Sequence, residues 1–259
     1  MARCDAAPTT PYGLVPVPVS WWGAPQTGPV DDGAQASVAA RIPGAAGLGL
    51  VVPPGAPTVP AIHLAEPDRV ARLIAARART VDRVTAMVWW YSASIVLLTP
   101  ALAGLVTGVP LSGRLADLSW VVRSDGLPVA AVSGAVTDDV AADLRGTLTA
   151  VIRAVAATGQ MGERPLWAIA TDSIANQLLA LGRALGDVPA ATAHATPLAA
   201  AIGSPLPMPR YVDVAGARFA QRASCCLMVE LPGGALCTSC PRRTPAERQA
   251  LLEQAARWF

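Results

Sequence analysis

The spacing of apolar residues predicts a chain built mainly from helices. In several stretches apolar side chains recur every three or four residues, which places them on one face of an α-helix. These stretches run from Pro67 to about Val84, across 84–113, from Asp139 to Gly159, across 165–185, across 196–202, and from Pro245 to about Trp258. The last one opens with Thr-Pro-Ala-Glu, a capping box with proline at the first helical position. We expect this final helix to fold back against the loop that precedes it.

The stretch 84–113 carries no charged residue. It is long enough to cross a membrane, which takes about twenty mostly apolar residues. Serines, glycines and Pro100 interrupt it, however, and a proline usually breaks or begins a helix. We therefore expect two buried helices that meet at Thr99-Pro100, with Pro100 in the first turn of the second. This interpretation predicts no integral membrane span and leaves room for peripheral membrane contact.

Two other segments have the residues of β-strands. Segment 118–132 contains two β-prone runs on either side of Asp125-Gly126, a pair that favours a tight turn, and so predicts a hairpin. A further extended piece is expected at Tyr211-Val-Asp-Val. Together with the helices, these segments predict an α+β fold: mainly helical, with a small antiparallel sheet and a C-terminal cysteine-rich loop followed by a helix.

Composition divides the chain into three regions. Residues 1–60 are rich in proline, glycine and alanine, so we expect only short helices or extended pieces there, and doubtful order. Residues 61–210 carry most of the helices and the hairpin near 118–132. Residues 211–259 contain four of the five cysteines, and the fifth, Cys4, lies outside any metal-like spacing.

Two predicted helices carry polar residues with more than one interpretation. The first carries five arginines, which we interpret as a solvated face rather than the lining of a cleft for an anionic ligand: Arg69, Arg72, Arg77, Arg79 and Arg83. The helix over 165–185 carries a polar seam, for which we favour core packing of the tryptophan and solvation of the others over ligand contact: Trp167, Asp172, Ser173 and Asn176.

The composition argues against several classes of function. Hydrophobic residues make up 53% of the 259 residues, enough for a buried core, so the chain is not a disordered protein. The net charge of +2 comes without a basic run or stripe, which argues against nucleic-acid binding. Only two histidines are present, His63 and His194, and neither lies in a motif for acid–base or nucleophilic catalysis.

Four cysteines near the C-terminus are the strongest chemical signal: Cys225-Cys226, ten residues, Cys237, two residues, Cys240. Thiolates are the ligands of zinc sites and iron–sulfur clusters, and a two-residue spacer lets a tight turn aim both sulfurs at one metal. The adjacent pair is unusual, because neighbouring side chains point to opposite faces of an extended strand. The backbone must therefore bend at Cys225-Cys226 if both are ligands.

The spacing alone leaves three alternatives open. Zinc sites normally separate paired ligands by two to four residues, which the adjacent pair does not satisfy, whereas a two-iron cluster can take two ligands from each half of the loop. Disulfides between the halves would suit a small secreted protein, and the start of this sequence lacks the apolar core of a signal peptide. We favour an iron–sulfur cluster over zinc, disulfides or free thiols, and expect a cytoplasmic protein.

This spacing resembles the signature of the FhuF-like family of ferric siderophore reductases: Cys-Cys, ten residues, Cys, two residues, Cys, then proline. Pro241 completes the match, and Leu-Pro-Gly-Gly at 231–234 is in the family's style. The specific motif covers only the last forty or so residues. Upstream, the resemblance is diffuse and rests on the general layout and on short aromatic runs such as Trp89-Trp90-Tyr91 and Leu166-Trp167-Ala168. It implies a [2Fe-2S] cluster held by the four cysteines within 211–259, and a siderophore-reductase-like domain over 61–210.

The resemblance further implies an iron–sulfur oxidoreductase that reduces siderophore-bound Fe(III) to Fe(II) by one electron and so releases iron in the cytoplasm. A ferric siderophore would be the small-molecule partner. An external donor such as a ferredoxin or a flavoprotein would supply the electron, since the sequence carries no flavin or nicotinamide motif. Two alternatives from other classes stay open: a zinc-stabilised binding module, and an iron–sulfur electron carrier or sensor without siderophore specificity.

Five residues near the cysteines are candidates to tune such a cluster. Amide hydrogen bonds to sulfur and nearby positive charge raise its reduction potential. Two glycines can bring amides close, and three arginines can supply charge or guide an anionic complex: Gly233, Gly234, Arg222, Arg242 and Arg243. We also expect the adjacent cysteine pair to bind one iron and the Cys-x-x-Cys pair to bind the other.

Overall fold

The computed structural model describes residues 33–53 and 56–258, so Cys4 lies outside the described residues. The described helices are α1 (Gly33–Ala39), α2 (Pro67–Ala75), α3 (Arg83–Thr107), α4 (Val140–Thr158), α5 (Arg164–Leu185), α6 (Val188–Ala193), α7 (Ala195–Ile202) and α8 (Pro245–Ala256). Short 3-10 turns lie at Ala45–Leu48, Ala61–Ala65 and Met228–Glu230. The described strands are β1 (Thr58–Pro60), β2 (Leu118–Val122), β3 (Pro128–Ser133), β4 (Tyr211–Val214) and β5 (Ala217–Ala220).

The fold is α+β and mainly helical, as the sequence predicts. One sheet has the order β1–β2–β3 and the other pairs β4 with β5, and all these pairings are antiparallel. The hairpin predicted over 118–132 is confirmed, with Gly126 in its turn at a φ of +79°. A side chain at Gly126 would collide with the carbonyl oxygen of Leu73, so the hairpin turn packs closely on α2. The third strand, β1, lies in the proline-rich region and was not predicted.

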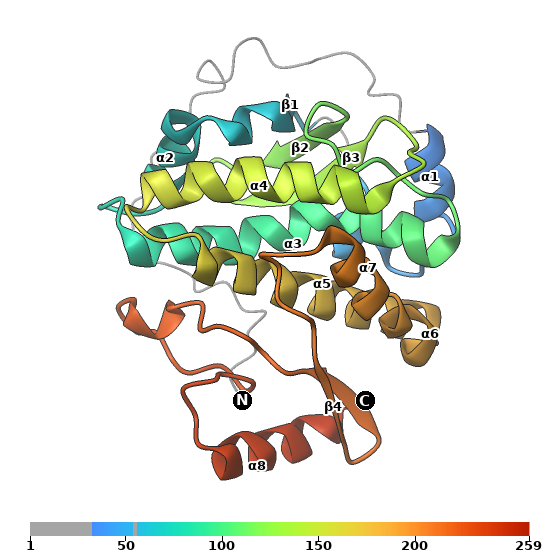
Figure 1. Cartoon of the computed structure of the whole chain (residues 1–259), viewed down its shortest axis with the longest axis vertical. Coiled ribbons are helices and arrows are strands. Elements are labelled where there is room, and N and C mark those ends of the chain that lie inside the picture. Colours follow the sequence, from blue (N-terminus) through green and yellow to red (C-terminus); the bar gives the residue numbers. More distant parts are fainter. Residues whose placement is uncertain (1–32, 54–55, 259) are drawn as a thin grey trace.

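Helix α3 runs through the centre of the core (Figure 1), and the β1–β3 sheet, α4 and α5 pack around it. Two of its tryptophans join these layers. Trp90 donates from Nε1 to the carbonyl oxygen of Leu166 in α5 at 2.9 Å. Trp89 donates to Gly126 at 3.2 Å and meets Trp120 of β2 edge to face, with ring centroids 6.3 Å apart. Trp89 and Trp90 thus satisfy their N–H groups on neighbouring layers. Among the other described indoles, Trp167 bonds Glu163 at the start of its own helix, and the buried Nε1 of Trp120 has no hydrogen-bond partner.

The predicted break at Thr99-Pro100 is wrong, because α3 continues through Pro100 as one helix. A proline inside a helix costs about 3 kcal/mol or more through the lost hydrogen bond and ring clash. Here the surrounding residues are fully buried, and their packing outweighs this local cost. Among the described residues, α3 is also the one helix long and apolar enough to cross a membrane, and 72% of its most apolar window is buried inside the protein.

The single arginine-bearing helix predicted from Pro67 to Val84 is also wrong. Helix α2 ends at Ala75, and Asp82 starts α3 by accepting the backbone N–H groups of Val84 and Thr85 at 2.9 Å. Periodicity alone does not reveal this capping box, because apolar residues continue across the break. Arg77, in the connection, pairs with Asp125 of the hairpin turn at 2.6 Å.

The other long helices form where the sequence predicts them. Asp139 caps α4, Gly186 ends α5 in the left-handed conformation, and the Thr244–Glu247 capping box opens α8. Helix α6 and strand β5 were not predicted, because each is short and lacks a clear period of its own. The segment around 33–53 joins the main core through Gln35, whose amide bonds Leu50 and Ala131 across the chain.

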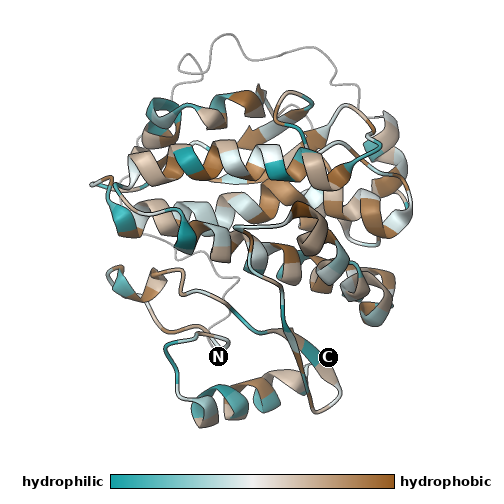
Figure 2. Ribbon diagram, in the orientation of Figure 1, coloured by the Kyte–Doolittle hydropathy of each residue, from teal (hydrophilic) through white to brown (hydrophobic). Residues whose placement is uncertain are grey.

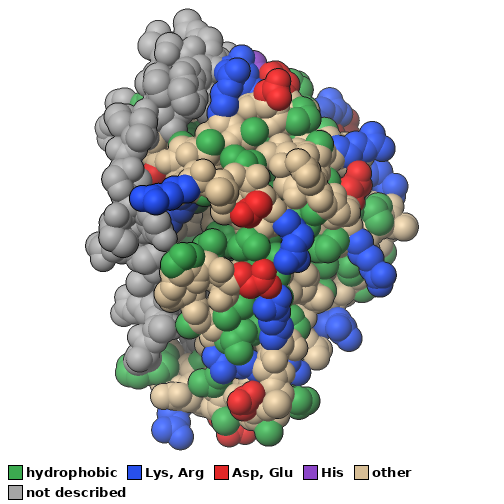
Figure 3. Space-filling view, turned by 90° about the vertical axis from the view of Figure 1, so that its left-hand side faces the viewer, with side chains coloured by type: hydrophobic (Ala, Val, Ile, Leu, Met, Phe, Trp, Pro, Cys, Tyr) green, Lys and Arg blue, Asp and Glu red, His purple; other side chains and the backbone are tan. Residues whose placement is uncertain are grey.

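The C-terminal residues form a lower layer beneath α5 (Figure 1), with the β4–β5 hairpin on one side and the cysteine loop on the other. Colouring by hydropathy shows brown residues concentrated on α3 and α5 and more teal on α8 (Figure 2). The face that carries the cysteine loop shows arginines interspersed with acidic and apolar side chains rather than a continuous basic stripe (Figure 3). The C-terminal layer therefore packs beneath the main core, and the adjacent cysteines lie where the two meet, with Cys226 in the core cluster and Cys225 packed against it.

Candidate metal centre

The four cysteines lie in an irregular loop between β5 and α8. The chain bends at Ala223 and Ser224, and Leu227 adopts a left-handed φ of +63° directly after the adjacent pair. Such a φ is unfavourable for leucine and persists only where the surroundings hold it. The bend that the adjacent cysteines require is therefore present, and it lies on either side of Cys225 and Cys226.

The sulfurs approach one another across the loop rather than along it. Cys225 Sγ lies 3.9 Å from Cys240 Sγ, and all four thiols are free of disulfides. Two thiolates on one tetrahedral metal, with bonds near 2.3 Å, lie about 3.8 Å apart. The structure thus pairs one member of each half of the motif, which differs from the predicted pairing of neighbours along the chain.

The arrangement does not suit a single tetrahedral ion. Within the described ranges, no three histidine, cysteine, aspartate or glutamate side chains converge as a site for one metal ion. A structural zinc needs four ligands around one point, whereas a two-iron cluster needs two at each end. The sulfur pair at Cys225 and Cys240 therefore fits one end of a [2Fe-2S] cluster better than it fits a zinc site.

Arg222 lies directly behind the other two sulfurs. Its Nη1 donates to Cys237 Sγ at 3.3 Å and lies 3.6 Å from Cys226 Sγ. The side chain is 3% exposed, and its guanidinium stacks on the ring of Tyr91 in α3, 4.8 Å from the centroid. Burial lowers the pKa of Arg222, but the groups around it hold the pKa above its usual value, so the side chain is a permanent cation.

Asp172 of α5 anchors this part of the loop, and the prediction that it is solvated is wrong. The buried carboxylate accepts the backbone N–H of Ala223 at 2.7 Å and Arg222 Nε at 3.3 Å. Burial raises the pKa of Asp172 above its usual value, against these two partners, which lower it. Ser173 is buried too and bonds Ser94 of α3 at 2.7 Å, so Asp172 and Ser173 both face the interior, whereas Asn176 is half-buried.

The other predicted tuning residues support the loop. Arg243 donates to the carbonyl oxygens of Leu236 and Cys237 at 2.6 and 2.9 Å. Arg242, 45% exposed, pairs with Glu230 at 2.5 Å, and Arg83 of α3 reaches the same carboxylate at 3.3 Å. The three arginines thus take different positions, with Arg222 behind the sulfurs, Arg243 along the backbone and Arg242 at the surface.

The two glycines shape the turn rather than reach the sulfurs. Gly233 adopts a left-handed φ of +73°, and the N–H of Gly234 donates to the carbonyl oxygen of Leu231 at 2.9 Å. A Cβ at Gly234 would collide with the carbonyl oxygen of Met228. Their contribution in this structure is therefore the tight path of the backbone between the two halves of the motif.

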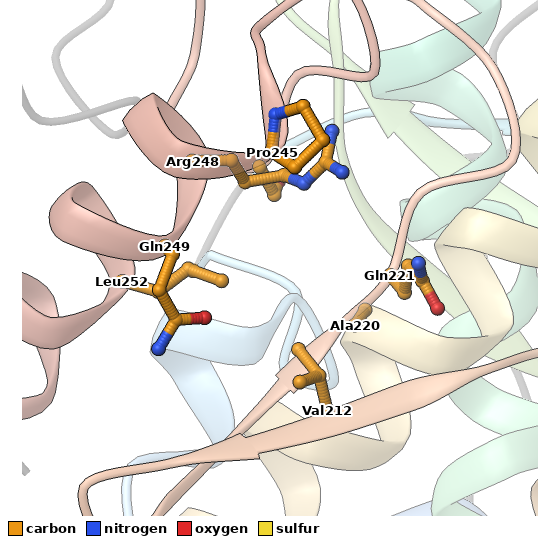
Figure 4. A pocket seen from close by; sticks show the side chains of 8 residues that line it. Val212, Ala220, Gln221, Pro245, Arg248, Gln249 and Leu252 are labelled. Atoms are coloured by element: carbon orange, nitrogen blue, oxygen red, sulfur yellow. The ribbon is translucent and has the colours of Figure 1, made fainter.

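A small cavity of about 180 Å³ lies beside the loop, between the β4–β5 hairpin and α8 (Figure 4). Ser239, between the last two cysteines, lines it together with residues of both elements: Val212, Ala220, Gln221, Pro245, Arg248, Gln249 and Leu252. Cavities that enclose drug-sized ligands measure about 300–1,000 Å³. This one is too small to enclose a siderophore complex.

Residues 222–242 match the family model of the FhuF 2Fe-2S C-terminal domain. No curated protein matches the chain. The match contains all four cysteines and begins at Arg222, and it confirms the predicted cofactor, a [2Fe-2S] cluster. The residues present also fit this cluster. The four cysteines form no disulfide, and two of them, Cys226 and Cys237, lie against the buried guanidinium of Arg222, whose Nη2 has no hydrogen-bond partner among the described residues.

Sequence reasoning found the four cysteines and Arg222 but missed Asp172 and Tyr91 as their neighbours. Asp172 lies fifty residues before Arg222, and Tyr91 is further still, so no local spacing connects them to the loop. The sequence did offer one indication of such a contact, namely an aspartate inside an otherwise apolar helix. An aspartate is rarely buried without a partner.

Proposed function

We propose that this protein is a ferric siderophore reductase, which transfers one electron to siderophore-bound Fe(III) and releases Fe(II). The observation that carries the proposal is the [2Fe-2S]-type cysteine loop, in which the residues Cys225 and Cys237 are half-buried rather than fully buried. Oxygen ligands of siderophores hold Fe(III) far more tightly than Fe(II), so a single electron loosens the metal. A one-electron donor at the surface is sufficient for this task.

The cluster supplies the electron, and the chain's own residues hold, orient and shield it. Arg243 fixes the path of the backbone around Cys237, and the turn at Gly234 brings the two halves of the motif together. Arg242 adds a positive charge at the exposed rim, where it can attract an anionic ferric complex. Because the neighbouring cavity is too small to enclose a siderophore, the complex docks on the surface of the loop.

The electron reaches the protein from an external donor, such as a ferredoxin or a flavoprotein, in the cytoplasm. This part of the proposal is supported by the same exposed loop, which can meet a donor protein and a ferric complex in turn.

The test is a single-turnover experiment under anaerobic conditions. Protein reduced with dithionite and freed of excess reductant is mixed with a ferric hydroxamate siderophore, and cluster oxidation is followed by absorption while a chelator traps Fe(II). The gallium(III) complex of the same siderophore is the matched control, because it has nearly the same size and charge but accepts no electron. We expect oxidation and stoichiometric Fe(II) with iron and neither with gallium.

A second candidate is an electron carrier or sensor without siderophore specificity, favoured by the small volume of the cavity beside the cysteine loop, about 180 Å³. Reduced protein that oxidises at equal rates with ferric siderophores and with simple ferric chelates, and that binds no gallium siderophore, would support this candidate. Saturation of the rate with siderophore concentration, together with inhibition by the gallium complex, would exclude it.

A further inference from the structure

Arg222 is a buried cation whose carboxylate partner neutralises it only in part. Asp172 contacts Arg222 through one nitrogen at 3.3 Å, and it also accepts the backbone N–H groups of Ala223 and Ser224. The surface pair Arg218–Asp213 on the β4–β5 hairpin is bidentate by contrast, at 2.8 and 2.9 Å. A buried charge is costly unless it is paired and hydrogen-bonded, so Arg222 requires further negative charge.

The surroundings of the two remaining nitrogens of Arg222 indicate where the further negative charge lies. Nη1 is shared between the sulfurs of Cys226 and Cys237, at 3.6 and 3.3 Å. Nη2 is buried and has no hydrogen-bond partner in the described protein. Buried donors are rarely left unpaired, and an unpaired one indicates a missing ligand or water. A sulfur-rich anionic group held by the four cysteines would satisfy both nitrogens.

We propose that Arg222 is the internal counter-ion of the cluster and that it defines the ligand pairs: Cys226 and Cys237 bind the iron nearest Arg222, and Cys225 and Cys240 bind the other. The second pair follows from the 3.9 Å between its sulfurs, which matches two ligands of one tetrahedral iron. The first pair is the remaining one, and its members share a single donor nitrogen. This inference rests on the cluster of the proposed function and not on the identity of the substrate.

The position of Arg222 has a consequence for electron storage. Four thiolates give the site a net negative charge, which grows by one unit on reduction, and a cation in contact with two of the ligands stabilises the reduced form more than the oxidised form. Burial strengthens this effect, because water does not screen the charge. Arg222 therefore raises the reduction potential and directs the added electron to the iron of Cys226 and Cys237.

The first test measures the midpoint potential of the loaded protein by anaerobic redox titration, with iron and sulfide content determined beforehand. We expect Arg222→Gln to lower the ratio of reduced to oxidised protein at a fixed applied potential at least tenfold, which is 59 mV for one electron. Arg222→Lys, which keeps the charge but not the forked geometry, should fall between this variant and the wild type. Arg218→Gln is the control, and its potential should not change.

The outcomes separate clearly. A fully loaded Arg222→Gln protein with the wild-type potential would overturn the role of Arg222, and so would equal shifts in Arg222→Gln and Arg218→Gln. If Arg222→Gln does not fold or load, Arg222→Lys decides: a loaded lysine variant with a potential below that of the wild type supports the contact of Arg222 with the cluster, and a loaded one with the wild-type potential overturns it. If neither variant holds iron while Arg218→Gln loads normally, the assignment of the ligand pairs in the second test decides.

The second test assigns the ligand pairs with single Cys→Ser variants and ⁵⁷Fe Mössbauer spectra of the reduced protein. Serine at Cys226 or Cys237 should alter the ferrous doublet, and serine at Cys225 or Cys240 should alter the ferric doublet. Arg222→Lys should perturb the ferrous doublet without any change of ligand. The pairing is wrong if serine at Cys225 and serine at Cys226 alter the same iron. None of these measurements uses a siderophore, so a failure of this inference can be distinguished from a failure of the proposed reductase activity.

Discussion

The carboxylate of Asp172 accepts the backbone N–H of Ala223 at 2.7 Å, and this contact ties the cysteine loop to the middle of helix α5. The same carboxylate accepts Ser224 N–H at 3.4 Å and faces Arg222. The first bend of the loop is therefore held by the core and not by the loop itself. A core helix that is otherwise apolar thus determines where the cysteines begin.

Replacement of Asp172 by alanine should detach the loop from α5. It leaves Arg222 buried without its carboxylate and two backbone N–H groups without an acceptor, and loss of one partner of a buried ion pair costs about 3–5 kcal/mol. We expect a loss of stability of this order by urea denaturation, and faster amide hydrogen exchange over residues 221–240. Asp172→Asn, which keeps an acceptor oxygen, should lose less.

Asp213→Asn is the matched control, because Asp213 pairs with Arg218 at the surface and its side chain is 60% exposed. Exposed pairs contribute about 0–1 kcal/mol, so its stability should change by no more than that. Equal losses in Asp172→Ala and Asp213→Asn would contradict the anchoring role.

Gly234 should be essential for loading of the cluster. A Cβ at this position collides with the carbonyl oxygen of Met228 and lies 2.9 Å from that of Leu231, so Gly234→Ala must open the turn between the two halves of the motif. We expect a severalfold loss of bound iron and sulfide after anaerobic reconstitution, with little change in the circular dichroism of the helices. Gly162→Ala is the control, since no atom lies within 4 Å of a Cβ there, and it should load normally.

The parts of this structure that the sequence predicts are those with local causes. Helix α4 begins at an aspartate cap and has a regular spacing of apolar residues. The Cys-x-x-Cys half of the motif forms a tight turn through its two-residue spacer. Both features can therefore be predicted from neighbouring residues alone. Helix α3 continues through Pro100 because the residues around it are buried, and their packing overrides the tendency of proline to break a helix. The contacts of Arg222 with Asp172 and Tyr91 depend on how three distant segments meet.

The ligand pairing illustrates the same limit at the site. Adjacent cysteines suggest one shared metal on grounds of proximity, but a bend on each side of them sends Cys225 towards Cys240. The identity of the four ligands follows from composition and spacing. The backbone conformation decides which sulfurs face each other, as at Leu227 with its left-handed φ. Leucine rarely adopts this conformation, so the sequence does not predict it.

Stability at low pH should depend on Asp143, in the first turn of α4. Burial raises the pKa of its carboxyl, but Arg114 at 2.7 Å and Ser112 at 3.0 Å outweigh burial and hold the pKa below its usual value. A carboxyl with a lowered pKa in the folded state stabilises the fold above its unfolded pKa, and this contribution disappears as the pH falls through the folded pKa.

Asp143→Asn should therefore be less stable than the wild type by about 1–3 kcal/mol at pH 7, since a buried charge-assisted hydrogen bond is lost. The difference should shrink below about pH 4, where the carboxyl of the unfolded chain begins to take up its proton, and should be smallest once the folded carboxyl is protonated as well. Urea denaturation of both proteins at several pH values measures this difference in stability. Asp139→Asn, which keeps an N-cap side chain, is the control, and a constant difference across pH for Asp143→Asn would contradict the prediction.

Arg242 should affect the rate of electron transfer to anionic ferric complexes. Its side chain is 45% exposed, pairs with Glu230, and lies at the rim of the loop, where its charge can attract a negative complex before contact. We expect Arg242→Gln to slow single-turnover oxidation by an anionic ferric siderophore severalfold at low salt, with a smaller effect at high salt, where charges are screened. Neutral siderophores should react at nearly the wild-type rate.

Arg153→Gln is the control for Arg242→Gln, because Arg153 is an exposed arginine of α4, away from the cysteine loop, and its loss changes net charge by the same amount. Equal slowing in both variants would mean that overall charge, and not the rim of the loop, sets the rate. Stopped-flow absorption of the cluster gives both rates directly. An effect of Arg242→Gln that is independent of salt and of siderophore charge would instead indicate that Arg242 supports the loop through Glu230, whose carboxylate also meets Arg83 of α3.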